Sequence, residues 1–201
     1  MQGKKVSVEN TDGSVVQKCL SGNPDAYEEL VIRYQKPVYN LAYRLLGNTE
    51  DAKDITQEAF VKAYQSLTKY NPDYSFGSWI FRITQNLSID HLRWKKRRPQ
   101  ISIDEPIGNG IDSDEDESLH LQIVDQSPDA RTTLIEEQKN KRIEQIIQSL
   151  PEKYRSVVVL RHIEGLQIGE IAQVLDMPEG TVKINLYRAR NLMKEKLGDL
   201  S

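Results

Sequence analysis

The chain has 201 residues, of which 38% are hydrophobic and 28% charged, and its formal net charge is −3. This length allows one or two small domains, and no apolar run approaches the roughly 18 residues that a membrane-spanning helix needs. A single cysteine, Cys19, excludes an intrachain disulfide and a zinc site built from several cysteines. Because the first residues contain no apolar secretion signal, we expect a cytoplasmic protein.

Three helices are predicted in the first half of the chain, after about ten polar residues at the start. Asn23-Pro24 is a helix-start pattern and Gly47 a helix-stop pattern, with apolar residues between them at helical spacing. A second helix is predicted from Thr49, which can cap it, to about Leu67. A third covers about residues 76–95.

Residues 99–129 differ in composition from both flanks. Residues 99–118 include seven acidic residues and no Lys or Arg. A structureless segment of this length is uncommon inside a compact domain, so it marks a boundary. We therefore divide the chain into an N-terminal domain at 1–98, an acidic flexible linker at 99–129 and a C-terminal domain at 130–201. The alternative is a disordered spacer with no role of its own.

Helical patterns resume in the C-terminal domain, and neither half shows the alternation of a strand. Helices are predicted at about 130–150, 151–161, 168–175 and 179–197. The expected fold is therefore all-α, with two small helical bundles joined by the acidic linker.

The last two helices predict a helix-turn-helix. Met177-Pro178 cannot easily continue the first of these helices, so the chain turns there. Asp176 stands where such turns often carry Gly, and a short polar residue tolerates the left-handed conformation better than most. Ala172 is small at the place where the two helices must approach closely.

The second of these helices has a cationic side opposite its apolar stripe. At about 100° per residue, Lys183, Tyr187, Asn191 and Arg188 fall away from Val182 and Leu186. A recognition helix in a major groove needs this arrangement, since Arg can contact guanine and Asn can contact adenine. The alternative is an ordinary amphipathic helix with a solvated basic side.

Aromatic residues precede a basic run in the N-terminal domain. Aromatic rings stack on exposed bases and cations neutralise phosphates, so this composition is typical of single-stranded nucleic-acid binding. Trp79 lies on the apolar stripe and is expected in the core, whereas Tyr74 and Phe76, in or beside a loop, are expected to contact nucleic acid. The acidic side of the 49–67 helix is, on composition alone, a solvated surface.

Four sequence stretches together resemble the extracytoplasmic-function (ECF) sigma factors of bacterial RNA polymerase. They are Asp51–Phe60, Phe76–Asn86, Asp90–Arg93 with the basic residues after it, and Gly180–Lys183 with Tyr187–Arg190. The resemblance covers about residues 12–197 and keeps both domains in order. It implies a subunit that binds core RNA polymerase, directs transcription from promoters with −10 and −35 elements and aids DNA melting.

The resemblance also assigns roles to residues. The polymerase clamp helices would bind Asp51, Asp54, Gln57 and Glu58. The −10 element would be contacted by Tyr74, Phe76, Asn86, Arg93, Lys95, Lys96, Arg97 and Arg98. The −35 element would be contacted by Lys183, Ile184, Tyr187, Arg188, Arg190 and Asn191. Arg190 falls at about 80° from Val182, near the core edge, which favours a phosphate contact. The linker would pass near the RNA path, the C-terminal domain would sit on the polymerase flap, and an anti-sigma factor would be a regulatory partner.

Two other classes of function were considered. A stand-alone helix-turn-helix regulator with an N-terminal sensing bundle shares the C-terminal pattern, but it does not explain the aromatic and basic residues from 76 to 98. An enzyme is disfavoured because His91, His120 and His162 are scattered and no phosphate loop or nucleophile motif is present. We expect no catalytic residue, no metal and no cofactor, and Cys19 is expected to be inert rather than redox-active.

Overall fold

The computed structural model describes residues 9–97 and 141–198, and these residues form helices and turns without a strand. The prediction of an all-α fold is confirmed. Within the described residues, no helix combines the length and the apolar character needed to cross a membrane. The predicted linker at 99–129 lies outside the described residues, and so do the exact limits of the two predicted domains.

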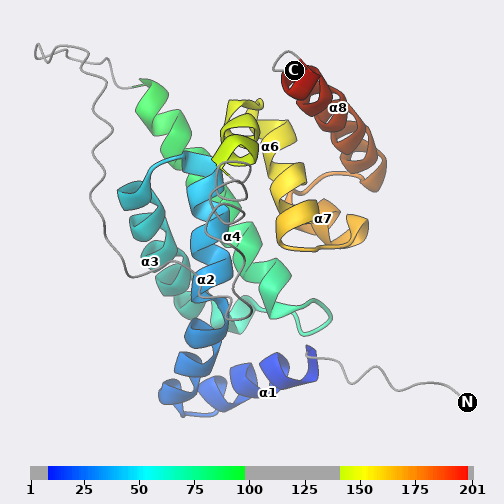
Figure 1. The fold of residues 1–201 in the computed structure, drawn as a ribbon. Helices are drawn as coiled ribbons and strands as arrows, with labels where there is room; N and C mark the ends of the chain where they lie inside the picture. Colours follow the sequence, from blue (N-terminus) through cyan, green and yellow to red (C-terminus); the bar gives the residue numbers. More distant parts are fainter. Residues whose placement is uncertain (1–8, 98–140, 199–201) are drawn as a thin grey trace, which may run out of the picture.

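Long helices packed side by side make up the N-terminal part (Figure 1). Their bounds are α1 (Glu9–Leu20), α2 (Tyr27–Leu46), α3 (Thr49–Gln65) and α4 (Phe76–Arg97), with short 3-10 turns η1 (Pro24–Ala26) and η2 (Leu67–Lys69). α2, α3 and α4 pack against one another, and α1 lies across the end of this bundle.

The ends of α2 and α3 follow from their local sequence. Gly47 adopts a left-handed conformation, φ 71°, and its N–H donates to the Tyr43 carbonyl at 2.7 Å, which closes α2 as predicted. Asn48, rather than Thr49, is the N-cap of α3, because its side chain accepts a hydrogen bond from the Asp51 N–H at 2.9 Å.

Helix α1 was not predicted from the sequence. Its apolar contribution is small: Val15 and Val16 are buried in the core, and Asp12 is buried beside them. The Asp12 carboxylate accepts hydrogen bonds from the Arg33 guanidinium and from the Tyr34 hydroxyl, both on α2. A buried carboxylate with two partners therefore fixes α1 to the bundle.

The C-terminal part is built from shorter elements. Residues 141–149 are helical, followed by α6 (Glu152–Val158), a π-helical turn η3 (Val159–Ile163), α7 (Ile168–Val174) and α8 (Glu179–Gly198). Gly165, with φ 72°, ends the segment that starts at Pro151, as predicted. Leu197, near the end of α8, is 46% exposed.

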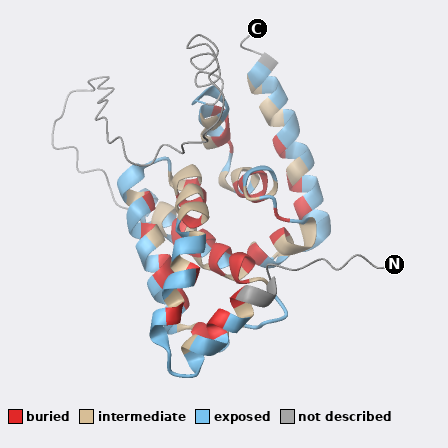
Figure 2. Ribbon diagram, turned by 60° about the horizontal axis from the view of Figure 1, so that its bottom comes forward, coloured by how far each residue is buried: buried red, intermediate tan, exposed pale blue. Residues whose placement is uncertain are grey.

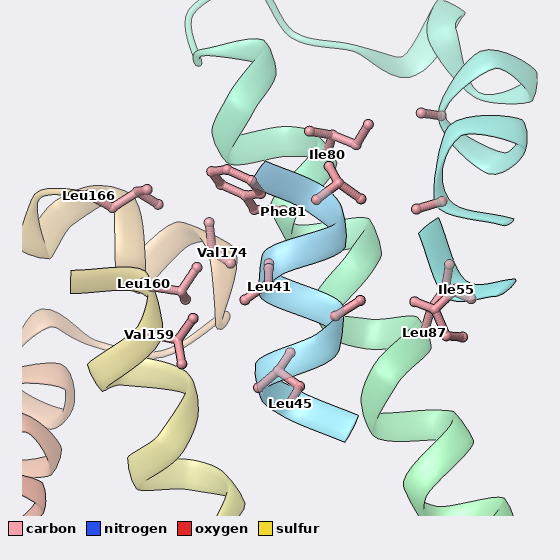
Figure 3. Close-up of a cluster of buried hydrophobic side chains, with 14 of the residues drawn as sticks. Leu41, Leu45, Ile55, Ile80, Phe81, Leu87, Val159, Leu160, Leu166 and Val174 are labelled. Carbon is pink, nitrogen blue, oxygen red and sulfur yellow. The ribbon is translucent and has the colours of Figure 1, made fainter. Parts of the chain in front are cut away.

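One hydrophobic cluster joins the two parts, although the sequence predicts two separate bundles. Buried residues line the inner sides of the helices in both parts (Figure 2). Figure 3 shows where they meet: side chains of α2 and α4 lie beside those of η3 and α7. The labelled residues at this meeting point are Leu41, Leu45, Phe81, Val159, Leu160, Leu166 and Val174.

Candidate nucleic-acid interface

Helix α8 lies at the edge of the molecule (Figures 1 and 2). Its cationic side is exposed to solvent. Lys183, Arg188 and Asn191 are exposed, and Ile184 and Tyr187 are exposed by 53% and 66%. Val182 and Ala189 on the other side are fully buried against the C-terminal core. Exposed apolar side chains between cations are what a surface that contacts bases and thymine methyl groups requires.

The turn between α7 and α8 fixes the orientation of α8. Asp176 has φ 52°, so the expectation of a left-handed residue at this position is confirmed. The Asn185 side chain is 7% exposed, and its amide faces the Met177 sulfur at 3.8 Å. At the other end of α7, the Gln167 N–H donates to the Glu170 carboxylate at 2.7 Å. These local contacts give the two helices a helix-turn-helix geometry.

Phe76 does not occupy the position that the sequence suggested. Its side chain is fully buried, and its ring packs against Tyr34, Tyr70 and Trp79 with centroid distances of 5.4, 5.9 and 5.5 Å. A ring enclosed in this way has no free side for a base, so the prediction that Phe76 contacts unpaired DNA is wrong for this structure. Tyr74, which is 48% exposed, keeps a free ring in the same segment.

Asn86 lies on the exposed side of α4, beside a hollow of about 470 Å³. The hollow is lined from one side by the end of α3 and the segment after it, and from the other by α4. Lys62, whose ammonium group pairs with Glu58 at 2.8 Å, Lys69 and Asp90 are among the residues that line the hollow. Amide and ammonium donors around a hollow can hold a base edge together with its phosphate.

The last turns of α4 form an exposed basic end. Arg93, Lys96 and Arg97 are exposed, and Lys95 is exposed although its ammonium group contacts Asp51. Arg98 lies outside the described residues. Trp94, which the sequence analysis overlooked, is 43% exposed within this basic end and packs on His91 at a centroid distance of 5.7 Å. Because Trp94 stands within a run of cations, it was not recognised as an aromatic residue that could contact nucleic acid.

The four residues predicted to contact the polymerase do not form a single exposed group. Asp54, Gln57 and Glu58 are exposed along α3. Asp51 has only 18% of its side chain exposed: its carboxylate lies 3.2 Å from His91 Nε2 and pairs with the Lys95 ammonium group, both on α4. Asp51 therefore joins α3 to α4. Of the other three exposed residues, Glu58 pairs with Lys62 one turn along α3 at 2.8 Å.

We call the contact region between the two parts, around Leu41, Phe81 and Leu160, the seam (Figure 3). Polar contacts accompany its apolar side chains. The Gln85 amide on α4 donates to the Ser156 hydroxyl on α6 at 2.7 Å, and both side chains are buried. The Arg155 guanidinium donates to the carbonyls of Leu45 on α2 and of Gln148 and Leu150 nearby. These contacts make the seam a specific interface rather than an apolar patch alone.

The seam also contains an open crevice of about 690 Å³, which brings a predicted DNA-contacting residue beside the helix-turn-helix. Tyr74, Trp79 and Arg82 line one side, and the α7–α8 turn lines the other. Arg82 lies 3.6 Å from the Asp176 carboxylate. In this arrangement Tyr74 faces the C-terminal part, whereas the cationic side of α8 faces solvent.

The carboxyl group of Glu164, at the seam, has a raised pKa. Burial raises the pKa of Glu164 to about 7, and the Arg44 guanidinium on α2 partly offsets this effect. No group of His, Cys, Asp and Glu side chains suited to a metal ion occurs within residues 9–97 and 141–198.

Two family models match the chain in the order expected from its two parts. The Sigma-70 region 2 model matches residues 30–98, and the Sigma-70, region 4 model matches residues 140–193. The ECF RNA polymerase sigma factor SigW of Bacillus subtilis is 34% identical over 92% of this chain and 96% of its own length. This chain belongs to the ECF sigma factors.

Other RNA polymerase sigma factors are similar over nearly the same extent. The sigma-E factor of Escherichia coli is 32% identical over 97% of this chain and 98% of its own length. The RNA polymerase sigma-H factor of Pseudomonas aeruginosa is 32% identical over 94% of this chain and 95% of its own. The resemblance read from the four sequence stretches is therefore confirmed.

Two solved structures share the fold. CnrH, solved in complex with the cytosolic domain of CnrY, superposes with a TM-score of 0.66 at 24% identity, covering 93% of this chain and 97% of CnrH. RpoE from Bartonella quintana, solved with the anti-sigma factor NepR, gives 0.63 at 19% identity, covering 86% and 96%. The helix arrangement described above is thus the fold of these two proteins.

Proposed function

We propose that this chain binds core RNA polymerase and directs transcription initiation from promoters with −35 and −10 elements. The observation that carries the proposal is the solvent-facing cationic side of α8 on a helix-turn-helix, in a chain that belongs to the ECF sigma factors. Lys183, Ile184, Tyr187, Arg188 and Asn191 read the −35 element in the major groove, and Arg190 contacts phosphate.

The N-terminal part recognises the −10 element. Tyr74 stacks on an unpaired base, Asn86 contacts a base edge, and the exposed basic end of α4 holds the phosphate backbone. Phe76 supports this surface from below, because its buried ring packs under Trp79 and Tyr70.

The polymerase binds the exposed acidic side of α3. Asp54 and Glu58 offer carboxylates and Gln57 offers an amide, and this group complements a basic partner surface. Asp51 supports polymerase binding indirectly, because its contacts with α4 fix the position of α3 relative to the basic end of α4. The polymerase clamp helices and flap, promoter DNA and an anti-sigma factor are the proposed partners.

The chain carries out no chemistry itself in this proposal. It acts in the cytoplasm, where the polymerase and promoters are, and it uses no metal or cofactor. The polymerase supplies catalysis, while this subunit supplies specificity.

Run-off transcription with core polymerase on genomic fragments tests the proposal. We expect defined start sites only when the chain is added, and loss of those starts for Arg188→Ala but not for the control Lys18→Ala on α1. If the chain does not bind core polymerase, or if it protects a duplex operator tightly on its own, the proposal is wrong. The second result would identify a stand-alone regulator.

A further inference from the structure

Trp94 is the aromatic residue within the basic run at 93–97, in the last turns of α4. It is 43% exposed, although tryptophan is on average highly buried in folded proteins. Its ring packs on the His91 ring with a centroid distance of 5.7 Å, and the His91 Nε2 lies 3.2 Å from the Asp51 carboxylate on α3. The indole is therefore held at the surface by its neighbours and is not enclosed in the core.

The surface around Trp94 carries positive charge, since Arg93, Lys96 and Arg97 are exposed. An exposed aromatic ring among cations is typical of surfaces that bind single-stranded nucleic acid. On such a surface the ring stacks on a base and the cations hold the phosphates. The end of α4 therefore has both kinds of side chain that an unpaired strand requires.

Two carboxylates lie close to this surface, and each is paired with a cation. Asp51 pairs with the Lys95 ammonium group. Asp90 lies 3.6 Å from the Arg93 guanidinium, one turn along α4. Because a cation balances each of these charges at short range, the surface as a whole remains attractive to phosphate.

Helical geometry places Trp94 beside a line of proposed DNA contacts on α4. Asn86, Arg93 and Arg97 lie along one side of the helix, because spacings of seven and four residues return to nearly the same direction at about 100° per residue. Trp94 stands about 60–100° around the helix from Arg93 and Arg97, and about 12 Å along the axis from Asn86. A strand whose phosphates follow this line can turn a base onto the Trp94 ring.

We propose that Trp94 is a further DNA-contacting residue, whose ring stacks on an unpaired base of the opened −10 segment. This inference rests on the proposed role of α4 in −10 recognition. It adds a base contact at the end of α4, where the proposed function has only cations that hold the phosphate backbone. Tyr74 supplies the other exposed ring, just before the start of the same helix.

The support beneath the ring favours this role. The contact with His91 restricts the rotation of the Trp94 side chain, and the pairing of Asp51 with Lys95 fixes this turn of α4 against α3. A ring that is positioned before DNA binds loses less rotational freedom when a base stacks on it.

Two substitutions of Trp94 separate stacking from simple apolar contact. Trp94→Phe keeps an aromatic face, whereas Trp94→Leu keeps an apolar side chain without one. Tyr39→Leu is a matched control, since Tyr39 lies on α2 and its ring stacks on Tyr43 with a centroid distance of 6.2 Å. Urea unfolding of each variant gives its folded fraction, and the binding data are expressed per folded molecule.

The experiment measures binding of the holoenzyme to two forms of one promoter, a duplex kept closed at low temperature and a form with an unpaired −10 segment. We expect Trp94→Leu to weaken binding to the unpaired form about fivefold to 150-fold, the range typical of one base–aromatic stack, and to change duplex binding by less than about twofold. Trp94→Phe should keep most of the wild-type affinity, and Tyr39→Leu should bind both forms like the wild type.

A fluorescent aminopurine base, placed at each adenine of the unpaired −10 segment in turn, reports stacking directly. Its emission is quenched when a ring stacks on it. We expect one position that is quenched by the wild-type holoenzyme and brighter with Trp94→Leu, while Trp94→Phe keeps the quenching. No such position would mean that the ring does not stack, and the inference would be wrong.

Four binding results would overturn the inference alone, with Tyr74→Ala still weakening binding to the unpaired form. They are unchanged binding by Trp94→Leu, equal losses for Trp94→Leu and Trp94→Phe, equal losses on the duplex and the unpaired form, and a loss explained by weaker binding of Trp94→Leu to core polymerase. If Tyr74→Ala and Lys96→Ala also bind the unpaired form like the wild type, the proposed role of α4 in −10 recognition is wrong as well.

Discussion

Replacing Phe76 separates a structural role from a DNA-contacting role. Phe76→Ala removes a fully buried ring, and a Phe-to-Ala change in a core typically costs about 3–5 kcal/mol. The site favours the upper end of that range, because three aromatic rings lie 5.4–5.9 Å from Phe76 and each such pair adds about 0.5–1.5 kcal/mol. A loss of this size removes much of the stability of an ordinary domain.

Urea unfolding followed by tryptophan fluorescence measures this loss. The chain contains two tryptophans, so a Trp94→Phe background leaves Trp79, whose ring lies 5.5 Å from Phe76, as the reporter of the N-terminal core. In this background, Phe76→Ala should shift the unfolding midpoint strongly to lower urea. The control is Tyr74→Ala, which alters an exposed ring and should change stability by less than about 0.5 kcal/mol.

In transcription assays, the activity per folded molecule should fall more for Tyr74→Ala than for Phe76→Ala, which is the reverse of their order in stability loss. Tyr74→Ala should impair promoter opening while the protein stays folded, and Phe76→Ala should lose activity only in proportion to its unfolded fraction. A Phe76→Ala variant that is as stable as the wild type, yet fails to open promoters, would refute the assignment of Phe76 to the core.

Three further changes test other features of the structure. Asp12→Ala leaves its two partners on α2 without their acceptor and should destabilise the chain by about 2–3 kcal/mol, which urea unfolding would detect; an unchanged midpoint would contradict the anchoring of α1. Ser156→Ala removes the buried partner of Gln85 and should cost about 1–2 kcal/mol, and a smaller cost in a Gln85→Leu background would identify the pair as the cause. Because the folded-state pKa of Glu164 is raised to about 7 from 4.5, its contribution to stability is fully present below pH 4.5 and is lost as the pH rises through 7. The unfolding midpoint of Glu164→Gln should therefore fall less between pH 5 and pH 7.5 than that of the wild type. If the midpoint falls equally in both proteins, other groups cause the pH dependence.

The sequence predicted those helix ends and turns that depend on local residues. Gly47 and Asp176 adopt left-handed conformations at the positions where the sequence suggested a stop and a turn. Helix α1 was missed because its stability comes from a distant contact: Asp12 pairs with residues 21 and 22 positions further along. A polar helix anchored by one buried carboxylate leaves no apolar periodicity to detect.

The exposure of the cationic side of α8 was expected from the sequence, whereas the burial of Phe76 and the pairing of Asp51 in the N-terminal part were not. The cationic side of α8 follows from helical geometry, since one side of that helix must be buried. Phe76 and Tyr74 are two residues apart, and composition cannot distinguish the buried ring from the exposed one, because the difference depends on Tyr34 and Tyr70. Asp51 was grouped with exposed acids because its partners on α4 are 40 and 44 residues away.

The contacts of Arg155 have a consequence for the separation of the two parts. Of the three carbonyls to which the guanidinium donates, only that of Leu45 belongs to the N-terminal part. If the parts moved away from each other, Arg155 would keep two of its acceptors, and the Leu45 carbonyl, at the open end of a helix, could be hydrated. The two parts can thus separate and reassociate without leaving the Arg155 guanidinium buried and unpaired. A reversible contact between two DNA-binding units would require this.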